Sequence, residues 1–299
     1  MKKLLISGCL LLLSAVALQA QEALTFTRIE RNPRAAAMAG AGTASVNNVA
    51  YAGFGKAALL PFLEGRLDTG LGFQLWAPGD ALAKTTNLQG GVSARFGHLG
   101  VSLAGAYQAG VPEGDFAPSD GLVGLGFAYG IGKYLSVGVN LRYAGQTLAP
   151  GAKVNGFSAD LSVAGKLPAG FTVIGGISTL GTRVKGSQED MEFVQPAYIF
   201  LGAGWNGRFG KSALELDLDG EYDVAGKLSG ALGAEYAYNQ LLFVRAGYRL
   251  SAANAVIPSH LALGLGVQFA GFRIEAAWMG AASYAPKNNT LTFGLGYRF

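Results

Sequence analysis

The sequence predicts an all-β protein, a transmembrane up-and-down antiparallel β-barrel of about 14 strands with an N-terminal plug segment. Three observations lead to this prediction. The composition is rich in glycine and poor in charge, apolar and polar residues alternate from Arg66 to the end of the chain, and long connections alternate with short ones.

The composition excludes the common soluble and helical classes. Of the 299 residues, 46 are glycine and 14% are charged, while 50% are hydrophobic. Ordinary chains carry roughly 25% charged residues, so too few are present to cover the surface of a soluble enzyme. A helical membrane protein needs about 20 consecutive apolar residues, and no such run follows the first twenty positions. Apolar residues are frequent, but after the first twenty positions they form no long uninterrupted run.

The first twenty residues are predicted to be a signal peptide. Lys2 and Lys3 precede an apolar run over residues 4–17, and small residues favour cleavage after Ala20 or, as an alternative, after Ala17. A lipoprotein cleavage box ending at Cys9 is a rival interpretation, although its apolar stretch is very short. Cys9 is the only cysteine, so we expect no disulfide or thiol chemistry in the exported protein.

Residues 21–64 are predicted to form a plug or helical segment that precedes the barrel. They show no strand alternation, and residues 32–45 are mostly small. Pro33 stands where a helix can begin.

Residues 65–299 are predicted to form the barrel. Leu67, Thr69, Leu71 and Phe73 alternate with polar or small residues, and the same period of two recurs in about 14 segments. An even number of strands allows closure, which removes the sheet edges that lipid cannot accommodate. The last segment ends at Phe299 and resembles the carboxy-terminal insertion signal of outer-membrane barrels.

Connection lengths provide an independent test of the same architecture, because such barrels have long outer loops and tight periplasmic turns. Long connections are expected near residues 77–86, 111–119, 147–153, 178–196, 251–259 and 281–289. Short turns are expected near residues 98, 132–133, 168–169, 206–207, 239–240 and 270–271. One expected outer connection, near residues 224–227, is short.

Charged residues on the polar side of the strands are predicted to face the lumen, where they can have structural or ligand-binding roles. They are Arg95, Arg142, Asp160, Glu215, Asp217, Glu235, Arg245, Arg249, Arg273, Glu275 and Arg298. Because both signs occur, these side chains can bridge across the wall. A barrel of about 14 strands is wider than side chains alone can fill. The sequence therefore favours a plugged or constricted barrel over a general diffusion pore.

No catalytic, cofactor-binding or metal-binding residue is predicted, so we expect a protein that is not an enzyme and holds no cofactor. His98 and His260 are the only histidines, and the sequence marks no partners for a triad or a zinc site. Gly40 and Gly42 lack the flanking strand and helix of a nucleotide motif. The net charge is +4, but the basic residues alternate along the strands and form no basic patch. No nucleic-acid partner is therefore expected.

A family resemblance adds to these predictions. Residues 31–44 (RNPRAAAMAGAGTA), followed by residues 50–54 (AYAGF) and 57–60 (AALL), resemble the amino-terminal signature of the PorV/PorQ family, a branch of the FadL-like outer-membrane barrels of Bacteroidota. The resemblance implies a 14-stranded barrel with an amino-terminal plug in the outer membrane of a Gram-negative bacterium. It also implies a role in type IX secretion for PorV and PorQ relatives, and transport of hydrophobic molecules for FadL relatives.

Two functions from different classes therefore remain open. The first is a non-enzymatic scaffold or shuttle for protein secretion or surface attachment, with secreted cargo or secretion-machinery proteins as partners. The alternative is a FadL-like channel for small hydrophobic molecules; outer-membrane lipids surround the barrel in both. The longest loop is the first candidate contact surface for a partner, through Lys185, Glu189, Asp190, Met191 and Phe193.

Overall fold

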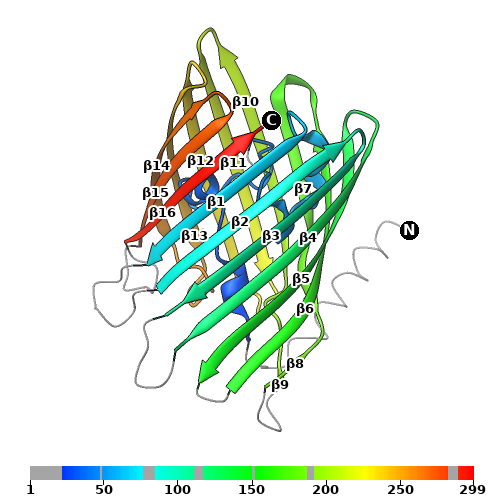
Figure 1. Cartoon of the computed structure of the whole chain (residues 1–299), viewed down its shortest axis with the longest axis vertical. Helices are drawn as coiled ribbons and strands as arrows, with labels where there is room; N and C mark the ends of the chain where they lie inside the picture. Colours follow the sequence, from blue (N-terminus) through cyan, green and yellow to red (C-terminus); the bar gives the residue numbers. More distant parts are fainter. Residues whose placement is uncertain are drawn as a thin grey trace.

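The computed structural model describes residues 22–47, 49–76, 85–110, 117–149, 152–186, 192–281 and 289–299. Fourteen strands form a closed barrel, and each pairs in antiparallel fashion with its neighbours (Figure 1). The strands are β1 (Leu67–Trp76), β2 (Thr85–Phe96), β3 (Leu99–Ala109), β4 (Ser119–Ile131), β5 (Leu135–Ala149), β6 (Ala152–Lys166), β7 (Phe171–Gly181), β10 (Tyr198–Phe209), β11 (Ser212–Asp223), β12 (Leu228–Tyr238), β13 (Leu242–Ser251), β14 (His260–Phe269), β15 (Phe272–Ala281) and β16 (Thr290–Arg298).

The barrel closes between its first and last strands. Asp68 of β1 pairs with Arg298 of β16, and the register runs without a break to Trp76 and Thr290. The predicted all-β barrel of about 14 strands is confirmed. Among the described residues, no helix is long and apolar enough to span a membrane.

The outer surface of the barrel is apolar. On β4, for example, Val123, Leu125, Phe127 and Tyr129 are 41–56% exposed, whereas the adjacent Leu122 is buried against the interior. Exposed leucine, phenylalanine or valine recurs in this way on every strand of the barrel. Such a surface is stable when lipid covers it, which explains why so few residues of the chain are charged.

The two ends of the barrel differ. At the turn end, short connections join β2 to β3, β4 to β5, β6 to β7, β10 to β11, β12 to β13 and β14 to β15, and the last strand ends there. The longer connections lie at the opposite, loop end, together with two short ones, between β5 and β6 and between β11 and β12, of which the second was predicted. A short 3-10 helix, η5 (Pro168–Gly170), forms the turn between β6 and β7.

Two predicted connections were wrong. Asn206 and Gly207 lie inside β10, where the Trp205 ring covers Gly207, and the turn comes at Gly210 with a φ of +62°. The connection near residues 147–153 is short, because β5 extends to Ala149 and β6 begins at Ala152. In both places the strand pairing continues past residues whose types favour a turn.

Residues 22–47 and 49–66, which precede β1, lie inside the barrel (Figure 1), and the helices among these described residues are short. They are η1 (Thr25–Arg28), α2 (Pro33–Ala36), η2 (Ala52–Phe54) and η3 (Ala57–Phe62). The helix α2 begins at Pro33 as predicted, and the Asn32 side chain accepts a hydrogen bond from the Arg34 amide, 3.0 Å away. We call residues 22–66 the plug; in Figure 1 its blue helices are enclosed by the strands.

Glycines on the inner wall make room for the plug. A Cβ added at Gly91, Gly124 or Gly138 would lie 2.2–2.3 Å from plug backbone atoms of Ala50, Gly53 or Ala58. On the opposite strands, Cβ atoms at Gly247 and Gly264 would lie 2.3 Å from Met38 and Ala37. These contacts are too close for any larger residue, so the plug backbone packs directly on the barrel wall.

A small two-stranded sheet lies at the loop end, where Val184 and Phe193 pack against the start of the plug and the inner side of the wall. Strands β8 (Val184–Lys185) and β9 (Glu192–Phe193) pair within the connection between β7 and β10. The amide of Ala23 donates to the carbonyl of Val194, 3.1 Å away, so the start of the plug joins this loop.

Candidate functional site

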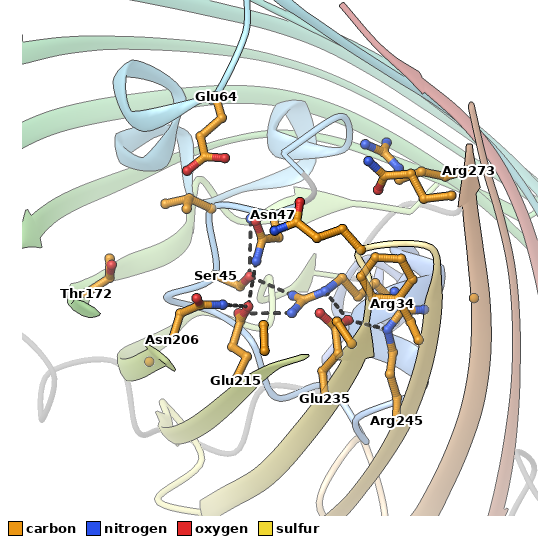
Figure 2. Close-up of a pocket in the computed structure, with 18 of the residues that line it drawn as sticks. Arg34, Ser45, Asn47, Glu64, Thr172, Asn206, Glu215, Glu235, Arg245 and Arg273 are labelled. Atoms are coloured by element: carbon orange, nitrogen blue, oxygen red, sulfur yellow. Dashed lines mark hydrogen bonds and ion pairs between the residues drawn. The ribbon is translucent and has the colours of Figure 1, made fainter. Parts of the chain in front are cut away.

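A polar cavity of about 560 Å³ lies between the plug and the turn end of the barrel. Figure 2 shows Arg34 of the plug at its centre, reaching Glu215 of β11 and Glu235 of β12. The Arg34 guanidinium lies 2.9 Å from Glu215 and 2.8 Å from Glu235, and it donates to the Ser45 hydroxyl at 2.6 Å. Burial alone lowers the pKa of Arg34, but these carboxylates raise it well above its ordinary value.

The ion pairs continue along the wall from Glu235. Arg245 of β13 lies 2.5 Å from Glu235 and 3.1 Å from Glu275 of β15. All of these side chains are at most 6% exposed, so each charge depends on its partner for compensation. Arg34 is therefore the plug's contribution to a charge network that crosses several strands.

A second group of charges ties the plug to the closing strands. Asp68 of β1 accepts from Arg273 at 2.6 Å and from Arg298 at 3.2 Å. Arg298 also donates to the carbonyl of Asn47, and the Asn47 side chain donates to Glu215 at 2.6 Å. Residues 43–47, which we call the strap, are thus held from both sides of the cavity.

A smaller pocket of about 130 Å³ lies on the loop-end side of the plug. Aromatic and apolar side chains line part of it, and basic side chains line the rest. The apolar group includes Phe54, Tyr198, Phe200, Ile257 and Met279, and the basic group is Arg28, Arg31, Lys56, Arg142 and Arg249.

Most of these basic groups have carboxylate partners. Arg28 lies 2.9 Å from Glu221, which also pairs with Arg249, and Arg142 lies 2.5 Å from Asp160. Arg31 is different, because its guanidinium donates to the carbonyls of Phe26 at 2.7 Å and Ile29 at 2.9 Å. Burial lowers the pKa of Arg31 to about 10.

Ser45 lines both the polar cavity and the loop-end pocket. The strap is therefore a part of the plug at which the two spaces adjoin. Its side chains are small, and hydrogen bonds from Arg34 and to Glu215 hold it in place. Ala44 and Val46 also pack in the hydrophobic cluster that contains Phe200 and residues of η3.

The structure brings most of the predicted lumen-facing residues into these networks. Glu215 and Glu235 pair with Arg34, and Arg245 links Glu235 to Glu275. Arg273 and Arg298 meet at Asp68. Four more residues of the set are buried. Arg142 and Asp160 pair with each other, and Arg249 pairs with Glu221. The carboxylate of Asp217 lies close to Gly204. Arg95 stands apart, half-buried in a separate groove at the turn end.

The predicted outer contact surface is only partly described. Lys185 is exposed on β8, but Phe193 is 6% exposed and packs with Leu24 and Phe26 of the plug. The interpretation of Phe193 as an outward contact was wrong, because the plug's apolar start covers it. Glu189, Asp190 and Met191 lie outside the described residues.

Sequence reasoning missed the plug's own contribution to the site. Arg28 and Arg34 lie in a segment without strand alternation, so no period assigned them a direction. Asp68 and Glu221 could have been found, since both occupy polar positions in alternating strands. Asn140 was also missed; its side chain accepts from the Ala57 amide at 3.1 Å and donates to the Ala52 carbonyl at 2.7 Å.

Comparisons with known proteins identify solved structures with a similar fold. No protein-family model and no curated protein matches the chain. Among solved structures, the toluene transporter TodX of Pseudomonas putida is similar at 15% identity and a TM-score of 0.57, covering 93% of this chain and 98% of TodX.

Two further solved structures are similar over comparable lengths. The monoaromatic hydrocarbon channel CymD is 14% identical with a TM-score of 0.64, covering 90% of this chain and 97% of CymD. A Pseudomonas aeruginosa FadL homologue is 11% identical with a TM-score of 0.60, covering 90% of this chain and 98% of the homologue. The narrower resemblance to PorV/PorQ stays a prediction. The chain is therefore a transmembrane β-barrel with the FadL-like fold, closed around an amino-terminal plug.

Proposed function

We propose that the protein is a non-enzymatic outer-membrane channel that takes up small hydrophobic molecules, with its loop end outside the cell and its turn end in the periplasm. The orientation follows the rule that outer-membrane barrels have short periplasmic turns. Similar barrels described as a toluene transporter and a monoaromatic hydrocarbon channel support the class of solute. The predicted signal peptide at residues 1–20 supports export.

One observation carries the proposal, namely that spaces on opposite sides of the plug meet at Ser45. The loop-end pocket receives the solute, and the polar cavity leads to the turn end. A solute that moves from one to the other passes the strap, so the strap is the gate of this path.

The loop-end pocket fits the proposed solutes in size and chemistry. Its volume of about 130 Å³ is close to the roughly 150 Å³ of an apolar cavity that accepts benzene. Rings of Phe54, Tyr198 and Phe200 can pack on an aromatic solute. Arg28, whose guanidinium carbon lies 4.4 Å from the centre of the Tyr198 ring, fixes the orientation of that ring.

The strap can open locally because side chains rather than buried backbone ladders hold it. Its anchors are the Ser45 bond to Arg34, the Asn47 bonds to Glu215 and Arg298, and the Thr43 amide bond to Asp219 at 3.0 Å. A hydrogen bond to a charged group contributes about 1.5–3 kcal/mol, so losing one raises the open population about tenfold or more.

Uptake of radiolabelled toluene by cells with and without the barrel tests the proposal. We expect faster uptake with the barrel, and about tenfold faster uptake with Asn47→Ala than with the wild type where strap opening limits the rate. Asn155→Ala is the matched control, since Asn155 is an exposed residue of β6 and none of the described hydrogen bonds of the strap involves it. Equal uptake with and without the barrel would contradict the proposal.

A secretion scaffold is the second candidate function. The resemblance of residues 31–44 to the PorV/PorQ signature favours it, as does exposed Lys185 on the small loop-end sheet. Affinity purification from outer membranes, paired with extraction of bound small molecules, separates the two functions. Recovery of secreted cargo or secretion-machinery proteins supports the scaffold, whereas a stoichiometric hydrophobic ligand without a protein partner supports the channel.

A further inference from the structure

The turn end of the barrel carries a rim of basic side chains. Exposed lysine and arginine residues recur in its turns and strand ends, and they are Arg66, Lys133, Lys166, Arg208 and Lys211. None of the ion pairs between described residues involves them. Glu64 is the acidic residue that lies beside them, so the rim is strongly positive.

A groove of about 380 Å³ lies within this rim, between the end of the plug and the turns. Pro61, Phe62, Leu63 and Glu64 form its plug side, so one acidic side chain lies in the groove. Its barrel side contains four basic or titratable side chains, Arg95, His98, Lys133 and Lys166. Arg95 is half-buried and takes part in none of the described ion pairs, so its guanidinium is available to an anion.

The outer side of the same rim is apolar. Around the β2–β3 and β4–β5 turns, Phe96 and Tyr134 are each 65% exposed, Tyr129 is 56% exposed and Leu99 is 44% exposed. Aromatic side chains at this level are typical of the boundary between lipid headgroups and acyl chains. A basic groove thus adjoins an apolar lipid-facing surface across the lip formed by these turns.

We propose that this groove binds the phosphate-bearing headgroup of an anionic phospholipid from the periplasmic leaflet. The acyl chains lie on the outer surface of β2–β5, and the phosphate lies among Arg95, Lys133 and Lys166. The arrangement matches the lipid in charge and in polarity, since the polar and apolar parts of one molecule meet the corresponding parts of the rim. The proposal rests on the orientation given above but not on solute uptake.

Native mass spectrometry of the full-length barrel in detergent tests the proposal. The probes are phosphatidylglycerol and phosphatidylcholine with the same acyl chains, and soluble glycerophosphoglycerol. We expect phosphatidylglycerol to bind more tightly than phosphatidylcholine, and each removed positive charge to weaken it about fivefold. The triple variant Arg95→Gln, Lys133→Gln, Lys166→Gln should therefore lose the preference.

The loop end provides a matched control. Arg183→Gln, Lys185→Gln, Lys227→Gln also removes one arginine and two lysines, but at residues remote from the groove, and it should keep the preference. The single variant Lys133→Gln, at an exposed turn residue, covers the case in which the triple variant fails to fold. Equal binding of both lipids, an unchanged preference in the turn-end variants, or binding of the soluble headgroup as tight as that of the lipid would each overturn the proposal.

Discussion

The strap and the segment that follows it in the plug are held by different forces. The η2–η3 segment (residues 52–62) is largely buried, and its backbone lies directly against Gly124 and Gly138. Uncharged side chains such as Asn140 and Ser162 bond its amides. The strap shares a hydrophobic cluster with this segment through Ala44 and Val46, but it also borders open space. Its hydrogen bonds come largely from charged side chains that reach it from several elements.

The difference indicates which part of the plug can move while the barrel stays intact. Displacing the η2–η3 segment separates many tightly packed atoms and leaves backbone groups without partners, which is costly in the interior. Displacing the strap removes only two small apolar side chains, Ala44 and Val46, from the hydrophobic cluster. The side-chain hydrogen bonds that it breaks lie next to a polar cavity, where water can replace them. We therefore expect opening to be local to the strap.

The largest effect is expected at Glu235. Glu235→Gln leaves Arg34 and Arg245 without their shared carboxylate, and breaking a buried ion pair costs about 3–5 kcal/mol. The measurement is the free energy of unfolding in urea, with the barrel in lipid vesicles. A loss below about 1 kcal/mol would show that Arg34 does not depend on this carboxylate.

A smaller effect is expected where the η2–η3 segment meets the wall. In Gly124→Ala the new Cβ lies 2.2 Å from the Gly53 carbonyl oxygen, so the plug must shift, at a cost of about 1–3 kcal/mol. Gly121→Ala is the control on the same strand, because no described atom lies within 4 Å of its Cβ position. Equal unfolding free energies for the two variants would mean that the packing contact does not matter.

The smallest effect is expected at Glu192, in the exposed pair with Arg183 at the loop end. Both side chains are about half exposed or more, and such surface pairs contribute about 0–1 kcal/mol. Glu192→Gln makes the same chemical change as Glu235→Gln. The ratio of the two losses in unfolding free energy therefore measures how much burial strengthens the dependence on the ion pair. Similar losses in both variants would contradict the role assigned to the buried network.

The barrel could be predicted from sequence because its constraint is local and repeated. Each strand alternates between lipid and interior, so a residue's position in the strand assigns its side chain to one face. On β4, exposed Val123 and buried Leu122 follow this period of two although both are apolar. Asn206 and Gly207 show where local signals fail. Their residue types favour a turn, but pairing with β11 continues through both.

The site was harder to predict because the plug has no repeating pattern. The charged side chains on the strands could be assigned to the interior, yet nothing in residues 21–64 indicated that Arg34 would meet Glu215 and Glu235. Those partners are far apart in sequence and come together only when the barrel closes around the plug. The glycines gave an indirect signal, since small residues facing the interior leave space for a segment to fill.

Locking the strap tests the central claim, that it opens while the η2–η3 segment stays in place. A Cβ added at Gly204 would lie 3.5 Å from the Ala44 Cβ, within the range of a disulfide, so Ala44→Cys with Gly204→Cys can fix the strap to β10. A Cβ at Gly126 would lie 3.3 Å from the Ala57 Cβ, so Ala57→Cys with Gly126→Cys can fix the η2–η3 segment instead. Cys9, the only native cysteine, lies in the predicted signal peptide.

The measurement is toluene uptake by each double variant before and after reduction of its disulfide. We predict that oxidation stops uptake through the strap-locked barrel, that reduction restores it, and that the lock on the η2–η3 segment leaves uptake unchanged. Undiminished uptake through the oxidised strap lock would contradict the claim that the strap is the gate.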